Sequence, residues 1–306
     1  MAGLAPFRAN CTWLFSALDS VETPHGKVEN ALGGSAVYFS VSASYFTRVG
    51  VVAVIGRDFP EEHLTFLTSK MIDLRGITRE EGLTFHWKGK YSGDLNEAET
   101  LDTQLNVFET FRPHIPDEYQ EAPFVFLANI DPELQRTVLE QVKRPRLTIC
   151  DTMNFWIDGK LDELKETIKQ VDILIINEGE ARLLSQESNL IKAYRQIASY
   201  GPQTLVVKQG SNGALLFTPS SIFSAPAYLL DTISDPTGAG DCFAGGFTGY
   251  LAKVNTVTEH ELRKAVIYGS VMASFNVEDF SLGRLKTLTV DEVEKRFASF
   301  KQLTRF

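Results

Sequence analysis

A single carboxylate beside a glycine-rich turn is the feature of this sequence best suited to chemistry. Asp241 directly follows Gly238-Ala239-Gly240, at the start of an apolar segment rich in small residues. Where such a turn opens a helix, the first backbone N–H groups lack partners within the helix and attract anions such as phosphate. A carboxylate at that point would repel a bound anion. It suits another task, which is taking a proton from a hydroxyl group that attacks phosphorus.

An ordinary helix start is the alternative, because Asp is a favoured N-cap residue. Three glycines inside the expected helix (Gly245, Gly246 and Gly249) argue against it. Each costs about 1 kcal/mol relative to Ala in a helix interior. Three such costs in one helix indicate close packing or a bound ligand.

The string Asp235-Pro236-Thr237-Gly238-Ala239-Gly240-Asp241, followed by Ala244-Gly245-Gly246, resembles the signature of the ribokinase-like (PfkB) carbohydrate kinase family. Further positions match in the same order along nearly the whole chain. The resemblance implies transfer of the γ-phosphoryl group of ATP to a hydroxyl of a small sugar, polyol or nucleoside, with Mg²⁺ as cofactor. It also implies that Asp241 is the catalytic base and that the amides of Gly238, Ala239, Gly240 and Asp241 form the anion hole.

Composition limits the class of protein. A chain of 306 residues with 43% hydrophobic content can bury the core of one large domain. The net charge of -9 argues against nucleic acid as a partner, since phosphate backbones require clustered Lys and Arg. Three widely spaced cysteines without a CxxC pair predict reduced thiols and a cytoplasmic location. No apolar run approaches the ~20 residues of a membrane helix, so we expect no membrane partner.

Strand and helix patterns alternate along the chain. Apolar runs at 11–18, 51–55, 124–129, 147–151, 172–177 and 204–208 predict buried strands, and helices are expected at 61–70, 132–142, 259–275 and 291–297. This alternation predicts βαβ units and a doubly wound, mostly parallel sheet flanked by helices. We therefore predict one ribokinase-like α/β domain over residues 1–306.

Residues 83–111 follow a different period. Polar and aromatic residues alternate there, and a second run follows at 103–108, as is typical of a small separate sheet that cannot bury a core alone. The resemblance implies that this sheet is a lid over the substrate, built from about 19–32 and 83–112. It further suggests that the lid is a candidate surface for homodimer formation.

The expected acceptor site lies early in the chain. Asp19 ends the first predicted strand, and Gly33-Gly34 precedes a helix. The resemblance implies that Asp19 grips substrate hydroxyls and that the glycine pair lets backbone amides approach them. The alternatives are a turn-forming Asp and a structural helix start. Asn129 falls just past a strand end, at the edge where open α/β sheets bind ligands.

Asn177 and Glu180 are three residues apart, at the point where a strand passes into a helix. This spacing is typical of a capping box. It also matches the family's Asn-x-x-Glu motif, which implies a role in placing Mg²⁺ through its waters, because a hard cation that keeps its waters needs few protein oxygens.

The remaining candidates concern the nucleotide. The resemblance implies that Lys208, Gly210, Gly213 and Asn276 lie beside it, although a plain hairpin would use the same lysine and glycines. It also makes Asp235 a candidate ligand for a monovalent cation such as K⁺. Ser281 stands where the family frequently has glycine, and Tyr38 and Ser40 stand where it often has Asn.

Substrate identity stays open at this stage. Aromatic residues of the expected lid (Phe85, Trp87, Tyr91 and Phe108) can stack on a nucleobase, which favours a nucleoside, or they can form the core of the lid itself. A family member that binds a nucleoside or sugar without reacting is the competing class. A dinucleotide-binding dehydrogenase is disfavoured because no Gly-x-Gly-x-x-Gly follows the first predicted strand.

Overall fold

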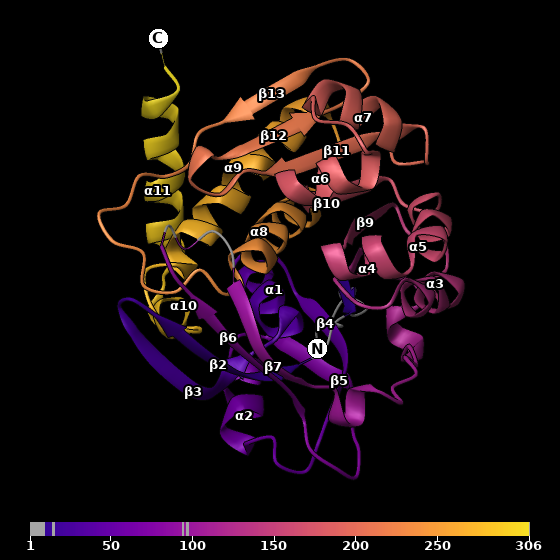
Figure 1. Ribbon diagram of the computed structural model, residues 1–306, viewed down its shortest axis with the longest axis vertical. Coiled ribbons are helices and arrows are strands. Elements are labelled where there is room, and N and C mark those ends of the chain that lie inside the picture. Colours follow the sequence, from indigo (N-terminus) through magenta and orange to yellow (C-terminus); the bar gives the residue numbers. More distant parts are fainter. Residues whose placement is uncertain (1–9, 14–15, 94, 96–97, 306) are drawn as a thin grey trace, which may run out of the picture.

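The computed structural model describes residues 10–13, 16–93, 95 and 98–305 (Figure 1). Within them a nine-stranded sheet has the order β13-β12-β11-β10-β9-β8-β1-β4-β5. Its strands are β1 (Asn10–Trp13), β4 (Val49–Ile55), β5 (Ile72–Arg79), β8 (Phe124–Leu127), β9 (Leu147–Asp151), β10 (Ile173–Asn177), β11 (Thr204–Lys208), β12 (Ala214–Phe217) and β13 (Ile222–Ala225). Neighbours from β5 to β11 pair in parallel, and β12 and β13 add an antiparallel edge. The predicted, mostly parallel sheet is confirmed.

Helices cover both faces of this sheet. Alternate residues of β4 point to opposite sides: Val51, Ala53 and Ile55 join one core cluster, and Val52 and Val54 join the other. The first cluster includes residues of α1 (Ser35–Ser44), α2 (Glu61–Ser69), α8 (Ala239–Val254), α9 (Glu259–Asn276), α10 (Gly283–Thr287) and α11 (Val290–Leu303). The second includes residues of α3 (Pro132–Gln141), α4 (Asn154–Gly159), α5 (Leu161–Ile168), α6 (Glu178–Ser185) and α7 (Leu190–Ala198). This is the predicted doubly wound arrangement.

The strand order reverses at β1. From β1 the chain winds outward through β4 and β5, then returns to β8 and continues through β9, β10 and β11 on the other side. In open α/β sheets, ligands bind at such a switch point, outside the carboxyl ends of the strands. Residues that follow β8, β9, β10 and β11 are therefore placed to form a site.

A second, four-stranded sheet forms the lid, shown in indigo and purple in the lower part of Figure 1. Its strands are β2 (Ala17–Thr23), β3 (Gly26–Gly33), β6 (Phe85–Tyr91) and β7 (Ala98–Gln104), in the order β3-β2-β6-β7. The predicted small separate sheet is confirmed. Its last strand differs from the run expected at 103–108, because those residues complete β7 and then form a short 3₁₀ turn (Asn106–Phe108). Since β7 is exposed throughout, it lacks the apolar alternation that marks a half-buried strand.

The expected first strand, 11–18, is not one element. β1 ends at Trp13, residues 14–15 lie outside the described part, and β2 of the lid begins at Ala17. Asp19 therefore lies inside a lid strand rather than at the end of a core strand, which corrects the prediction. A continuous apolar run does not reveal where one strand stops and the next begins, because both strands are apolar there.

Helix α8 packs backbone against backbone on its neighbours. A Cβ on Gly245 would lie 2.4 Å from the Phe39 carbonyl oxygen in α1, and one on Gly246 would lie 2.7 Å from the Tyr268 oxygen in α9. A Cβ on Gly249 would lie 3.0 Å from the Ala43 backbone, a slightly longer but still tight contact. The helix glycines are explained by close packing, one of the two explanations that the sequence left open.

Two further observations concern the described residues. Cys150 and Cys242 are free, buried thiols. Among the helices of the described ranges, none combines the length and the apolar character required to cross a bilayer.

Gly245→Ala should destabilise the protein, because its methyl group would force α1 and α8 apart. Overpacking of this kind costs about 1–3 kcal/mol. Urea unfolding of the variant should give a lower midpoint than wild type. Gly159→Ala is the matched control, since no atom lies within 4 Å of the position of its Cβ. Equal losses in the two variants would contradict the packing explanation.

Candidate active site

The predicted anion loop lies at the start of α8. Gly238 is the residue before the helix and has a φ of +74°, in the left-handed region. A Cβ there would lie 2.3 Å from the ring of Tyr38, which is buried in α1. A Cβ on Gly240 would lie 3.0 Å from Lys208 Nζ. Glycine at these two positions thus allows close contact with a tyrosine ring and with a lysine ammonium group.

Two of the predicted amides have contacts within the loop. The Ala239 N–H donates to the Pro236 carbonyl oxygen over 3.1 Å and closes the turn, and the Asp241 N–H lies against its own carboxylate and lowers its pKa. Ala239 therefore shapes the loop. The amides of Gly238, Gly240 and Asp241 are the candidates for binding an anion, and the Asp241 amide would exchange its carboxylate contact for a phosphate oxygen.

Asp241 lies in the first turn of α8, at the mouth of this loop. Burial raises its pKa to about 7, Asp151 and Asp19 act in the same direction, and Lys208 acts in the opposite one. A general base works best when its pKa is near the working pH. The environment of Asp241 is therefore suited to the predicted role.

Lys208, at the end of β11, contacts a carboxylate that the sequence analysis missed. Its Nζ lies 3.4 Å from Asp151 Oδ2 at the end of β9. Burial lowers the lysine pKa, but Asp151, Glu180 and Asp241 outweigh it and raise the pKa overall. Asp151 is buried, and its other oxygen accepts from the Thr152 N–H at 2.9 Å. An Asp that ends a buried strand near the switch point was the available signal.

Asn177 and Glu180 form the capping box that was one of the two predicted alternatives. The Glu180 N–H donates to Asn177 Oδ1, and the Asn177 N–H donates to Glu180 Oε2, both over 2.8 Å. The cap does not separate Glu180 from the site. Burial raises its pKa to about 7, Lys208 lowers it and Asp151 raises it, because both lie nearby.

No group of three or more His, Cys, Asp or Glu side chains within the described ranges is arranged to hold a metal ion. A Mg²⁺ ion placed by the predicted pair Asn177 and Glu180 alone would keep most of its waters, because two side chains supply few of the oxygen ligands in its octahedral shell. This fits the oxygen donors present, since Mg²⁺ commonly retains several waters and binds one or two carboxylates together with substrate phosphates.

The predicted acceptor residues are in contact with each other. Asp19 Oδ2 accepts from the Gly34 N–H over 3.1 Å, and a Cβ on Gly33 would lie only 2.0 Å from the same oxygen. Burial raises the pKa of Asp19 to about 7, the Gly34 amide lowers it, and Asp235 raises it. Gly33 is thus required for this lid carboxylate to reach the start of α1.

Other predicted residues have structural partners. The Asn129 side-chain oxygen accepts from Trp156 Nε1 at 3.1 Å. Gly210 and Gly213 form the turn between β11 and β12, where a Cβ on Gly213 would lie 2.1 Å from the Ala225 oxygen. These two glycines therefore build the hairpin named as the alternative.

Asn276 and Asp235 both organise the anion loop. Asn276 is only 1% exposed, its Nδ2 donates to the Thr237 oxygen over 2.7 Å, and its Oδ1 accepts from Cys242 Sγ at 3.3 Å. This differs from the predicted place at the edge of a nucleotide pocket. The buried Asp235 carboxylate accepts from the N–H groups of Thr237 and Ser281, over 2.9 and 3.1 Å.

Comparison with known proteins identifies the family. The model of the pfkB family of carbohydrate kinases matches residues 7–287, and the chain belongs to that family. It is a kinase, a phosphotransferase with an alcohol group as acceptor.

Individual relatives and solved structures show which kinases the chain is similar to. The chain is 31% identical over 241 residues to a cytidine kinase from Thermococcus kodakarensis, covering 76% of this chain and 85% of the relative. Its fold resembles that of the Methanocaldococcus jannaschii nucleoside kinase, with a TM-score of 0.75 and 20% identity. The match covers 95% of this chain and 99% of that structure. Its fold also resembles that of a putative ribokinase II from E. coli in complex with ATP and Mg²⁺, with a TM-score of 0.77 and 18% identity. The match covers 96% of this chain and 100% of that structure.

Asp241→Asn should retain ATP binding and lose phosphoryl transfer by about 10²–10⁴-fold, because the amide cannot accept the proton of the attacking hydroxyl. Product formation and nucleotide affinity, measured separately, test this. Comparable turnover in the variant would remove Asp241 from the catalytic role.

The same variant should change the pH dependence of stability. Wild-type Asp241 has a pKa of about 7 when folded, against an ordinary 3.8, so the folded state holds this proton more tightly. Stability of the ligand-free protein should then fall as the pH rises between those two values. Asp241→Asn removes this loss and should be the more stable protein at pH 8, by at most about 4 kcal/mol. Urea unfolding at pH 4 and pH 8 should show the difference closing at pH 4, and parallel curves would contradict the burial of this charge.

Proposed function

We propose that the protein is an ATP-dependent nucleoside kinase, in which Asp241 activates a hydroxyl of the nucleoside. The observation that carries the choice of acceptor is an aromatic platform on β6, made of Trp87, Gly89 and Tyr91. In the β2–β6 pair Asp19 lies opposite Trp87, and because side chains alternate along a strand, Tyr91 shares their face of the lid.

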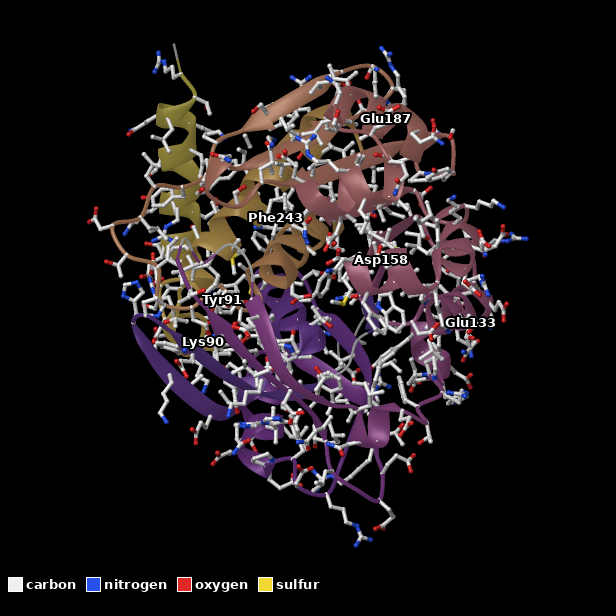
Figure 2. All side chains as sticks on the ribbon, in the orientation of Figure 1. Lys90, Tyr91, Glu133, Asp158, Glu187 and Phe243 are labelled. Atoms are coloured by element: carbon white, nitrogen blue, oxygen red, sulfur yellow. The ribbon has the colours of Figure 1, made fainter. Side chains whose placement is uncertain are left out.

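The platform is continuous because Gly89 has no side chain. A Cβ on Gly89 would lie 2.1 Å from the Trp87 ring, so the ring extends along the strand over the glycine. At the far end, Thr237 Oγ1 lies 3.4 Å from the Tyr91 hydroxyl. Figure 2 labels Tyr91 beside Lys90 at the end of the lid that is nearer to Phe243 of α8. A flat apolar surface between Asp19 and the anion loop suits a nucleobase better than a small sugar.

The Asp19 carboxylate of the lid would bind the ribose of the nucleoside, whereas the aromatic platform would bind the base. Asp19 and the Gly33-Gly34 backbone lie together, so they can accept from and donate to neighbouring hydroxyls of a ribose. The similarity to a cytidine kinase over most of its length supports a pyrimidine nucleoside as the first acceptor to test.

In the proposed reaction, Asp241 takes the proton from the attacking hydroxyl as its oxygen bonds to the γ-phosphorus of ATP. The Gly238, Gly240 and Asp241 amides and Lys208 neutralise charge on the phosphoryl oxygens, and ADP leaves. Asn177 and Glu180 would hold Mg²⁺ through its waters, and the ion would supply positive charge to the nucleotide phosphates. Asp151 holds the Lys208 ammonium group beside the loop.

Two finer features belong to the same proposal. Asp235 is a candidate neighbour of a monovalent cation such as K⁺, and activity measured in K⁺ against Na⁺ tests that role.

A homodimer through the lid is supported by the full exposure of edge strand β7, and light scattering in solution tests it.

The decisive experiment measures ADP release with a panel of nucleosides and sugars at saturating ATP and Mg²⁺. We expect kcat/KM for a pyrimidine nucleoside to exceed that for ribose or fructose by at least about 10²-fold. A substrate without the base loses base stacking worth about 1–3 kcal/mol and hydrogen bonds worth about 0.5–1.5 kcal/mol each. Trp87→Ala should lower kcat/KM for the nucleoside more than for any sugar. Ribose or fructose as the preferred acceptor would make the protein a sugar kinase, and the platform would then be the lid's own core.

A further inference from the structure

A hydrogen-bonded bridge joins the lid to the segment that precedes the anion loop. Its centre is Ser281, in the turn between α9 and α10. The Ser281 hydroxyl donates to the Leu32 carbonyl oxygen in β3 over 2.6 Å, and its N–H donates to Asp235 Oδ2 over 3.1 Å. One residue therefore contacts the lid strand that ends at Gly33 and the carboxylate that organises the anion loop.

Neighbouring hydrogen bonds and packing contacts join the same two parts of the molecule, the β2–β3 hairpin and the loop after α9. Thr23 of β2 donates to the Ser234 carbonyl oxygen over 2.9 Å, and the Ser234 N–H donates to the Val277 oxygen over 2.8 Å. The turn of the lid hairpin packs on the same loop, since a Cβ on Gly26 would lie 3.3 Å from the Phe280 ring. The β2–β3 hairpin is thus attached to residues 277–282 at several points.

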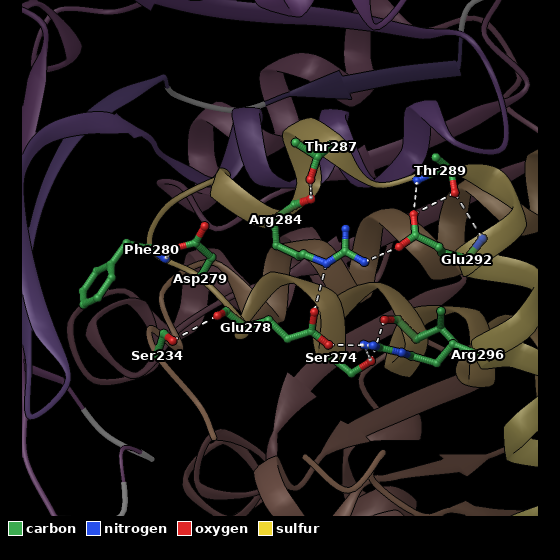
Figure 3. Close-up of polar contacts among 11 residues, drawn as sticks. Ser234, Ser274, Glu278, Asp279, Phe280, Arg284, Thr287, Thr289, Glu292 and Arg296 are labelled. Carbon is green, nitrogen blue, oxygen red and sulfur yellow. Dashed lines mark hydrogen bonds and ion pairs between the residues drawn. The ribbon is translucent and has the colours of Figure 1, made fainter. Parts of the chain in front are cut away.

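Residues 277–282 are themselves anchored. Glu278 accepts from Arg284 Nε at 3.0 Å and from Arg296 Nη2 at 2.6 Å, and its carbonyl oxygen accepts from the Ser234 hydroxyl (Figure 3). Arg284 also pairs with Glu292 at 2.6 Å. These ion pairs join the loop to α10 and α11, and a network in a partly buried setting is held more firmly than isolated surface pairs. The loop is therefore a fixed support against which the lid hairpin is positioned.

The backbone of Ser281 is strained. Its φ of +52° lies in the left-handed region, which glycine adopts readily and other residues adopt at a cost. The side-chain hydrogen bond to Leu32 is the interaction that glycine could not make. The two properties are separable by substitution, which makes the residue testable.

We propose that Ser281 is a positioning residue that couples the lid to the anion loop. By fixing Leu32, it holds Gly33, Gly34 and the Asp19 carboxylate they contact at a set position relative to Asp235 and the start of α8. The acceptor hydroxyl is then presented in line with the phosphoryl group. This rests on the proposed function only in placing the acceptor against Asp19.

The test compares Ser281→Gly with Ser281→Ala. Both remove the hydroxyl, but Gly relieves the backbone strain and Ala keeps it. Thr287→Ala is the matched control, because Thr287 is exposed and its hydroxyl bonds to the Arg284 carbonyl oxygen within α10. Each protein is measured for KM of acceptor and ATP, for kcat, and for hydrogen exchange of residues 17–33 without ligands.

In both Ser281 variants we expect KM for the acceptor to rise about 3–10-fold, the factor expected when one hydrogen bond is removed. KM for ATP should stay within about twofold, and exchange in residues 17–33 should quicken while Thr287→Ala resembles wild type. The proposal is overturned if Ser281→Gly matches wild type in exchange, or if both variants raise the two KM values equally. Hydrogen exchange needs no substrate, so a wild-type protein inactive on nucleosides would sink the nucleoside assignment while the exchange result still decides the role of Ser281.

Discussion

Three carboxylates lie around one ammonium group at the carboxyl ends of the central strands. The electrostatics of the site depend on this excess of negative charge. Asp151, Glu180 and Asp241 all interact with Lys208, which cannot neutralise them together. Burial is the main reason that the pKa values of Asp241 and Glu180 are raised to about 7; the negative charge of Asp151 raises them further, and Lys208 only partly offsets the two effects. A divalent cation would correct the balance. A metal ion bound with the nucleotide would supply that positive charge.

The fold assembles this cluster from distant parts of the chain. β9 and β11 contribute Asp151 and Lys208 as they end at the same edge of the sheet, and α6 contributes Glu180 from its first turn. α8 contributes Asp241 and is held close to α1 by its glycines, which sets the Tyr38 ring directly against Gly238. The groups proposed for catalysis and for binding the acceptor thus lie at one packed interface, where α1 and α8 approach each other through close glycine contacts.

Much of this was predictable because regular patterns carried it. Alternating strands and helices predicted the doubly wound sheet. The Gly238–Asp241 string predicted a glycine turn that opens a helix with a carboxylate in its first turn, as the structure shows, while the roles of base and anion hole stay predictions. Asp151 was missed because pairing between β9 and β11 side chains depends on the sheet order, which one sequence does not reveal. Asn276 was placed at a pocket edge, whereas tertiary packing gave both ends of its amide protein partners. Asp19 was assigned to the wrong strand because two apolar strands follow one another closely.

The exposed edge strand β7 of the lid affects how the protein associates with other polypeptide chains. Among the described strands β7 pairs only with β6, and such a free edge is a surface to which another polypeptide can add a strand. Its pairing with β6 skips Leu101, which leaves a bulge, and Glu99 and Asp102 place negative charge on either side. Bulges and charged side chains are two of the devices by which natural sheets avoid fibrous self-association. The exposed edge of β7 is therefore compatible with a closed pairing of two lids, as proposed above, while open-ended extension of the sheet is disfavoured.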